Sequence, residues 1–378
     1  MTMISSTGRV CAIALRKARS TSLRRLYVGM MTDTSMLRSM PVDLLKKLLY
    51  ATGILGLYHR IRNAGTLTVV MFHRVLDPRD PRWACCDPDY TLSAGLFGQC
   101  LQFFRRHYNI VSVEDVTKAR RDESRLPPRA LLITFDDGWA DNVEFALPQL
   151  RAMRVPGLMF VVSDAVDRAQ PFYQEQIVSA WRRGTLPLER LAGALGQAAA
   201  GARLDGGRHE PVLRDLIRIV EALPQLDRLR LLAELEPELA DGLRHMVTTA
   251  ELHLLQDGGV AIGLHGKTHT PMTHAADIDA ELGGARREMA ARMPHLEAPS
   301  TMSFPHGLYD ESIAARAHGS GFELVFTSDP TINVTNRAVG WLLGRLGFES
   351  ETVADAEGRF RPEWLAMYLF RKEHRSPV

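Results

Sequence analysis

Short runs of apolar residues, several of them ending in a polar or charged residue, recur along the chain and predict buried strands. They lie at 66–75, 129–138, 157–164, 260–266, 301–307, 323–329 and 339–348. Between most of these runs, apolar side chains recur three and four positions apart, which indicates helices that pack one face on a sheet. The alternation of strands with helices predicts an α/β fold with a parallel sheet.

The alternation breaks between residues 171 and 245. Amphipathic helical patterns fill this stretch, and no strand pattern is present in it. We interpret 171–245 as a helical insertion between two strand-and-helix units. We expect the apolar stripe of residues 213–226 to pack against the barrel or sheet beside it, because an amphipathic helix needs a partner for that stripe. After the insertion, residues 248–259 predict a helix capped by Thr248 or Thr249.

The first 60 residues have a different character. Seven Lys and Arg residues accompany one acid, Asp33, within the first 40 positions. We expect residues 1–60 to form a basic tail, or alternatively a targeting segment, followed by an amphipathic helix. The 11-residue uncharged stretch 48–58 has basic residues on both sides and is too short to cross a bilayer. The helix around residues 44–58 is therefore expected to pack on the domain or to contact a membrane surface peripherally.

Composition narrows the remaining choices. With 378 residues and 46% apolar content, the chain is able to form one large domain with an insertion, or two domains. A formal net charge of +2 gives no reason to expect a nucleic-acid partner. The chain has no apolar run long enough for a transmembrane helix, and no signal-peptide cleavage site follows the apolar stretch. We therefore favour a cytoplasmic or membrane-peripheral location over secretion, and we interpret 351–378 as a C-terminal helix and tail.

Two adjacent carboxylates, Asp136 and Asp137, stand at the end of the strand predicted over 129–138. Active sites in parallel α/β folds gather at the carboxyl ends of the strands. Histidines stand at the ends of other predicted strands: His73, His265 with His269 four residues later, and His306. One aspartate and two histidines on converging strand ends match a divalent metal site with open positions, such as zinc or non-haem iron.

A metal ion would also explain why two like charges stand side by side. If Asp137 is a ligand, its charge is offset, and Asp136 stays ionised beside it. A metal ion lowers the pKa of bound water toward about 7, so that Asp136 would take the proton as this water attacks a carbonyl. Each signal alone has a simpler explanation. Asp-Asp-Gly is common in turns, and His73 and His306 are compatible with capping or core roles.

At these motifs the chain resembles the polysaccharide deacetylase family, also called the NodB-homology domain or carbohydrate esterase family 4. "TFDDG" (134–138) stands as in the first motif of the family, and "HGKTH" (265–269) resembles its H-[ST]-x-x-H motif. "SFPHGLYD" (303–310) resembles the third motif. "TLTVVMFHRVLD" (66–77) resembles the opening strand of the branch in which this strand carries a histidine.

The resemblance covers roughly residues 65–170 and 246–348. It implies a distorted (β/α) barrel with fewer than eight strands, which would occupy 61–350 and be interrupted by the insertion. The chain departs from the family pattern at Gly266, where Ser or Thr is usual, and at His306, which replaces an aromatic residue. The histidine motif that usually follows the last strand, and that supplies the general acid, is missing.

The function that the resemblance implies is metal-dependent removal of an N-acetyl group from an amino sugar of a polysaccharide or glycan precursor. It implies one divalent metal ion, with zinc expected, held by Asp137, His265 and His269. Asp136 would be the catalytic base. Two further roles are implied: His73 as the general acid and the backbone N–H of His306 at the oxyanion. Arg345, at the end of the last predicted strand, is expected to tether Asp136 or another acidic group near the site, unless it is a surface residue.

Two other functions remain open from the sequence. One is a barrel that binds carbohydrate without cleaving it and carries the insertion as an interaction module. The other is a deacetylase that uses the same site to remove O-acetyl groups. In the reading that we favour, the partner is a carbohydrate substrate containing N-acetylated sugars.

Overall fold

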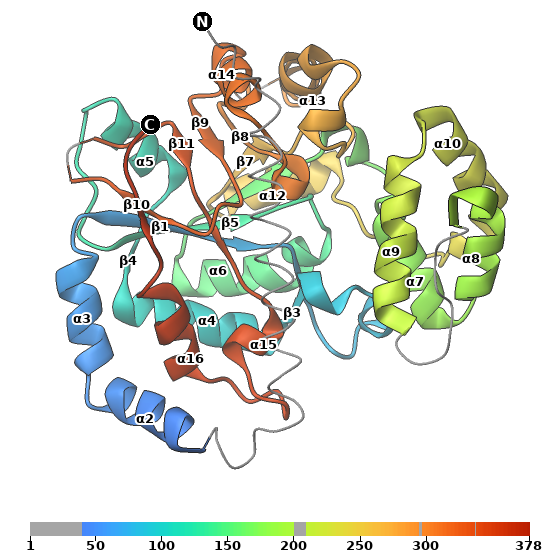
Figure 1. Cartoon of the computed structure of the whole chain (residues 1–378). Coiled ribbons are helices and arrows are strands. Elements are labelled where there is room, and N and C mark those ends of the chain that lie inside the picture. The colour runs from blue at the N-terminus through green and yellow to red at the C-terminus, as the bar shows by residue number, and fades with distance from the viewer. Residues whose placement is uncertain (1–39, 200–208, 295–296, 337) are drawn as a thin grey trace, which may run out of the picture.

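The computed structural model describes residues 40–199, 209–294, 297–336 and 338–378 (Figure 1). Its centre is a set of parallel strands paired in the order β1, β5, β6, β7, β8 and β9. Their bounds are Thr66–Phe72, Ala130–Phe135, Gly157–Val161, Val260–Leu264, Thr301–Ser303 and Leu324–Phe326. The predicted α/β class with a mostly parallel sheet is confirmed.

A broken strand closes this sheet into a barrel. Its first part, β11 (Leu342–Leu343), pairs with β9, and its second part, β12 (Leu346–Gly347), pairs with β1. The six strands and this broken one therefore form a ring of seven positions among the described residues. The predicted distorted barrel with fewer than eight strands is confirmed.

Apolar side chains on both faces of the strands hold the barrel together. In β5 all six residues are buried, as expected for a parallel strand covered on both sides. Alternate residues belong to two different clusters, because successive side chains of a strand point to opposite faces. Ala130 and Leu132 pack with residues of β1, β6 and β9, whereas Leu131 and Ile133 pack with the surrounding helices.

The helices of the barrel occupy the segments where apolar spacing predicts them (Figure 1). They are α4 (Ala94–His107), α5 (Val113–Arg120), α6 (Leu147–Met153), α12 (Thr249–Asp257), α13 (Ala285–Arg292) and α14 (Glu311–Gly319). Short π-helical turns, Asn142–Ala146 and Ala280–Gly284, precede α6 and α13. The Thr248 hydroxyl caps α12 by accepting from the Glu251 N–H, as predicted.

Several short elements complete the barrel domain. β2 (Arg74–Leu76) pairs with β3 (Thr91–Ser93), and β4 (Asn109–Ile110) pairs with β5. The prediction of a C-terminal helix and tail is only partly right. Two helices follow the barrel, α15 (Ser350–Val353) and α16 (Pro362–Leu369), and β13 (His374–Arg375) then pairs with β10 (Ile332–Val334).

The insertion is helical, and it stands beside the barrel (Figure 1). Its helices are α7 (Tyr173–Arg183), α8 (Leu188–Leu195), α9 (His209–Ala222), α10 (Gln225–Glu234) and α11 (Glu236–Leu239). The expectation that the stripe of 213–226 packs against the barrel is wrong. Leu213, Leu216 and Val220 belong to a cluster whose buried members all come from the insertion.

In the described part of the chain, from residue 40 onward, two helices precede the barrel where we predicted one. α2 (Met40–Ala51) and α3 (Ile54–Arg62) are separated at Gly53, whose φ of 79° is a left-handed conformation that ends a helix. The predicted basic tail falls on residues 1–39, outside the described residues. Among the described helices, none has the length and hydropathy needed to cross a membrane.

Candidate active site

The carboxyl ends of the barrel strands bring the predicted site residues together. Asp136 follows β5 directly, and its backbone N–H donates to the Phe72 carbonyl of β1 over 2.9 Å. Asp137 and Gly138 then adopt positive φ values of 78° and 84°, so the chain turns sharply at this point. Aspartate tolerates the left-handed region better than most residues, and such strain is typical of functional sites.

Arg345 holds the carboxylate of Asp136. It lies at the break between β11 and β12, and its guanidinium donates from Nη1 to Oδ1 over 2.6 Å and from Nη2 to Oδ2 over 2.7 Å. Both side chains are buried. Burial alone would raise the pKa of Asp136, but Arg345, followed by His265, lowers it below the usual value. Asp136 is thus kept ionised, and the surface alternative for Arg345 is excluded.

Asp137 lies between two imidazole rings. Its Oδ1 is 3.4 Å from His265 Nε2 and 3.2 Å from His269 Nε2. The buried Oδ1 has no hydrogen-bond partner, so the three residues together offer ligand atoms around one point. One carboxylate oxygen and two imidazole nitrogens suit a zinc-like divalent ion with open positions, and the residues therefore fit such an ion.

The protonation of these groups also suits a metal ligand set. Burial opposes ionisation of Asp137, but the nearby His269, His73 and His265 lower its pKa well below the usual range. Burial lowers the pKa of His265 to about 4, so its ring is neutral at physiological pH. Carboxylate and neutral imidazole are the forms in which these side chains bind a metal.

Neighbouring residues fix the orientation of the three candidate ligands. His265 Nδ1 lies 3.0 Å from the Ser303 carbonyl and 2.6 Å from its hydroxyl, which favours the tautomer that leaves Nε2 facing Asp137. The Trp139 indole N–H donates to the second oxygen of Asp137 over 2.9 Å. The ring of Phe172, at the start of the insertion, stacks on His269 with centroids 4.1 Å apart.

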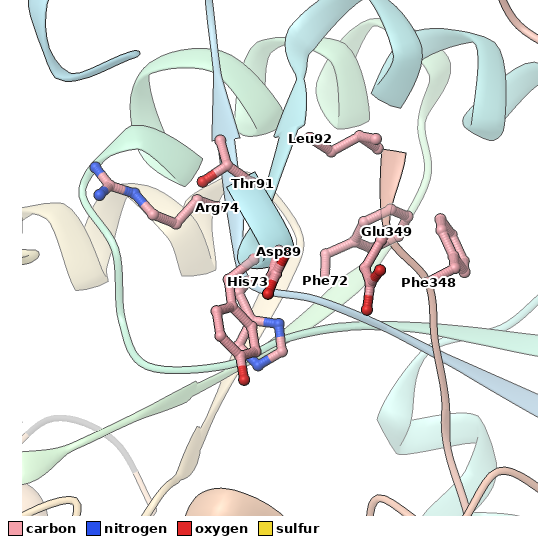
Figure 2. Close-up of a pocket in the computed structure, with 9 residues that line it drawn as sticks. Phe72, His73, Arg74, Asp89, Thr91, Leu92, Phe348 and Glu349 are labelled. Atoms are coloured by element: carbon pink, nitrogen blue, oxygen red, sulfur yellow. The ribbon is translucent and has the colours of Figure 1, made fainter. Parts of the chain in front are cut away.

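His73 ends β1 at the rim of the same site. Its ring packs edge-on against Tyr90, with centroids 5.0 Å apart, and it lies near enough to both aspartates to lower their pKa values. Asn142 fixes the backbone here by donating to the His73 carbonyl over 2.7 Å. Figure 2 shows His73, Asp89 and Glu349 around one pocket, whereas the Arg74 side chain runs away from it.

His306 stands beside His269, one of the candidate metal ligands. It has a φ of 55° in the turn after β8, its side chain is exposed, and its ring centroid is 4.6 Å from that of His269. Gly266, the departure from the family motif, has a φ of 76°. A Cβ at this position would come within 3.1 Å of the Glu281 carboxylate, so glycine suits the turn.

Known proteins resemble this chain in structure but not closely in sequence. No protein-family model matches the chain, and no curated protein matches it. Among solved structures, IcaB from Ammonifex degensii has 16% identity and a TM-score of 0.52, with 82% of this chain and 98% of that chain covered. The Streptococcus pyogenes deacetylase PplD, solved with acetate, has 14% identity and a TM-score of 0.50, with 81% and 99% covered.

A third structure extends the same likeness. BA0330 of Bacillus anthracis, provisionally named a polysaccharide deacetylase, has 12% identity and a TM-score of 0.50, with 81% of this chain and 69% of that chain covered. This chain has the polysaccharide deacetylase fold. The resemblance seen in the sequence motifs is therefore confirmed at the level of the fold.

Within this deacetylase fold, sequence reasoning missed several residues around the site. Ser303 and Trp139 each stand within the matched motifs or next to them, so their positions were a usable signal. Phe172 and Tyr90 come from the insertion and from a loop, where no periodic pattern indicates contact with a strand end. Their side chains reach the site only through the packing of segments that are distant in sequence.

Proposed function

We propose that this chain is a metal-dependent hydrolase that removes the N-acetyl group from an amino sugar of a polysaccharide or glycan precursor. The observation that carries the proposal is the arrangement of the two aspartates. Asp137 faces two histidines with an oxygen that lacks a hydrogen-bond partner, while the adjacent Asp136 is paired with a buried arginine. Adjacent carboxylates with different partners are suited to different roles, one as a ligand and one as a base.

Asp137, His265 and His269 would hold the ion, and we expect zinc. Such an ion acts as a Lewis acid on the acetyl carbonyl and makes water at its open positions more acidic. Asp136, kept ionised by Arg345, would accept the proton of the attacking water. The Arg345 pair would also fix the direction in which the carboxylate points, which matters for a proton transfer over a short distance.

The remaining steps concern the leaving amine and the developing oxyanion. An amine leaves poorly until it is protonated, and His73, at the rim of the site, is our candidate for the proton donor. The backbone N–H of His306 is our candidate for a hydrogen bond to the oxyanion.

Two measurements test whether the two aspartates have different roles: the metal content of the protein, and the release of acetate from an oligosaccharide of N-acetylated amino sugars. Asp136→Asn should keep about one metal ion per chain and lose hydrolysis at least about a hundredfold, because the amide cannot accept the proton. Asp137→Asn, His265→Ala and His269→Ala should lose the metal. Full metal occupancy in the two histidine variants would refute the ligand assignment, and reversed results for the aspartates would exchange their roles.

A pair of substrates tests His73. His73→Ala should strongly slow release of acetate from the N-acetyl substrate, but affect much less an activated ester whose leaving group needs no proton. Equal losses on both substrates would contradict the role of general acid. Acetate released from an O-acetylated sugar, with none from the N-acetylated one, would support the O-deacetylase alternative instead.

A further inference from the structure

The outer faces of α2 and α3 carry an apolar surface that the barrel does not cover. Eight of the thirteen exposed large hydrophobic side chains among the described residues lie here. They are Val42, Leu44, Leu45, Leu48, Ile54, Leu57, Tyr58 and Ile61, with exposed fractions from 41% to 73%. We name these eight residues the apolar edge. An exposed surface of this kind indicates an interaction site.

The spacing within the apolar edge is that of a helix face. Ile54, Leu57, Tyr58 and Ile61 stand at positions i, i+3, i+4 and i+7 of α3, which places them on one side of the helix. The opposite side of α3 is already anchored. Leu55 is buried in the barrel cluster, and the His59 ring stacks on Phe370 with centroids 4.0 Å apart.

α2 repeats this two-sided arrangement. Leu49 and Tyr50 pack against the barrel cluster, whereas Leu44, Leu45 and Leu48 remain exposed. Both helices therefore have an apolar side for the barrel and a second apolar side that no other element of the described residues covers. A helix that needed only the barrel would carry polar residues on its outer side.

The N-terminal end of the chain, which includes the apolar edge, differs in charge from the rest of the chain. Seven of its basic residues belong to residues 1–39, and four lie on α2 and α3: Lys46, Lys47, Arg60 and Arg62. Residues 1–63 contain 11 Lys and Arg and 2 Asp and Glu, for a net charge of 11 − 2 = +9. The remaining residues have 46 − 11 = 35 basic and 44 − 2 = 42 acidic side chains, for a net charge of −7. A strongly basic end on an otherwise acidic chain favours an anionic partner for that end.

We propose that α2 and α3 dock this protein on an anionic lipid surface. The leucine and isoleucine side chains would enter the region between headgroups and acyl chains, and the basic residues beside them would face the headgroups. A second copy of the chain is a poor occupant, because it would bring another basic end against the first. A bilayer offers both the apolar depth and the negative charge that this edge matches.

This docking would leave the candidate active site accessible. α2 and α3 lie across the barrel from the insertion, and the site lies on the insertion side, where Phe172 stacks on His269 (Figure 1). The acidic remainder of the chain would also be repelled from the same lipid surface. Both effects favour one orientation, with the α2–α3 side toward the lipid and the substrate side toward water.

Sedimentation of the full chain with vesicles tests the proposal. The vesicles contain phosphatidylcholine with about one third phosphatidylglycerol, and pure phosphatidylcholine vesicles serve as the comparison. We expect binding to the anionic vesicles that weakens as salt is added. Leu57→Ser with Ile61→Ser should reduce the affinity at least about tenfold, because two large apolar side chains no longer enter the interface. Lys47→Gln and Arg60→Gln should each reduce it about fivefold.

The matched control is Leu226→Ser with Leu229→Ser, an equally exposed apolar pair on α10 of the insertion. It should leave vesicle binding unchanged. The proposal is refuted if the wild type fails to bind anionic vesicles, binds neutral vesicles equally well, or loses as much affinity through the control pair. It is also refuted if the wild type is a dimer that the α3 variant converts to a monomer without vesicle binding, because a second copy then covers the edge. Acetate release from a soluble oligosaccharide should be the same in all these variants, so this test is independent of the proposed function.

Discussion

The insertion and the α2–α3 pair both lie outside the barrel, but different kinds of contact attach them. The insertion has a hydrophobic core of its own, whose buried members all lie between Ile177 and Leu239. Its contacts with the barrel include ion pairs, the buried pair of Arg74 with Glu175 and the partly buried pair of Arg214 with Asp87. A small apolar cluster that includes Trp139 and Met246 lies where the insertion joins the barrel.

The α2–α3 pair has no comparable core. Its buried side chain Leu55 and its partly buried Leu49 and Tyr50 belong to the barrel cluster. His59 is buried with them between Phe370 and Tyr108, at centroid distances of 4.0 and 4.5 Å. The difference indicates that the insertion depends on the barrel for its position, whereas α2 and α3 depend on it for their folded state.

The largest effect on the free energy of unfolding is expected where the insertion contacts the barrel. The Arg74 guanidinium donates to Asp141 over 2.8 Å and to Glu175 over 2.6 Å, and its side chain is fully buried. Arg74→Met leaves two buried carboxylates without their partner, which should lower the free energy of unfolding by about 3–5 kcal/mol. Urea denaturation measures this change.

The control is Arg218→Met on α9, because the ion pair of Arg218 with Asp215 is 59% exposed on both sides. Its effect should stay within about 0.5 kcal/mol. Equal losses in the two variants would mean that the buried pair does not join the insertion to the barrel, and the comparison above would fail.

The second prediction separates the two cores. Leu216 is fully buried in the insertion cluster, so Leu216→Ala should cost about 3 kcal/mol through lost burial and a cavity. Amide hydrogen exchange should become faster in α8 and α9, while β5 and β6 keep the protection of the wild type. Leu229→Ala, at an exposed position of α10, is the control and should change neither region. Faster exchange throughout the barrel would show that the two cores unfold as one.

The barrel and the insertion also show which features of a structure can be predicted from a sequence. The strand ends with Asp136, His265 and His73 were predictable, because buried strands have a clear apolar pattern and the site residues follow it directly. The apolar stripe of α9 was equally clear. Such a stripe predicts that one face of the helix is buried, but it does not predict which element covers that face. The strands β10 and β13 were missed, since elements of two or three residues carry too little pattern to recognise.

Contacts between segments that are distant in the sequence were still harder to predict. Arg345 stands 209 residues from Asp136, and only its position at a strand end suggested the pair. Nothing in the sequence indicated that Arg74 would join Glu175 across 101 residues. Both are buried ion pairs, and their partners are decided by how the barrel closes and how the insertion folds back on it.

The third prediction concerns the attachment of α3 and depends on pH. Burial, and then the charge of Arg129, lowers the pKa of His59 to about 3. Burial likewise lowers the pKa of the neighbouring His107 to about 4. A histidine whose folded pKa lies below its unfolded value of 6.5 stabilises the fold above that value, and this contribution is lost as the pH falls from 6.5 toward 3. At pH 5 the loss from His59 should be about 2 kcal/mol.

His59→Phe tests this dependence, because the new ring is able to keep the stack on Phe370 but does not titrate. The variant loses the contact of His59 Nδ1 with Asn63, so its stability at pH 7.5 should be somewhat lower. The decisive readout is the fall in unfolding free energy between pH 7.5 and 5, which should be smaller than in the wild type. His253→Gln, at an exposed position of α12, should leave that fall unchanged. An unaltered fall in His59→Phe would exclude His59 as its source.

The smallest effect is expected at the outer part of the contact between insertion and barrel. Arg214 on α9 donates from both Nη atoms to Asp87, and from one of them to Asp89 over 3.0 Å. Both aspartates stand just before Tyr90 in the chain, and the Tyr90 ring packs against His73.

Arg214→Lys keeps the charge but cannot form the two-pronged contact, so the free energy of unfolding should fall by only about 0.5–1 kcal/mol. The activity should respond through Tyr90. If the loop that carries it is less firmly held at the rim of the site, KM for the oligosaccharide should rise more than kcat falls, because Asp136 and the candidate metal ligands are untouched. Arg190→Lys is the matched control, since Arg190 pairs with Glu234 and Glu238 inside the insertion. A change in KM for the control as large as that for Arg214→Lys would mean that the insertion acts on the site as a whole rather than through this contact.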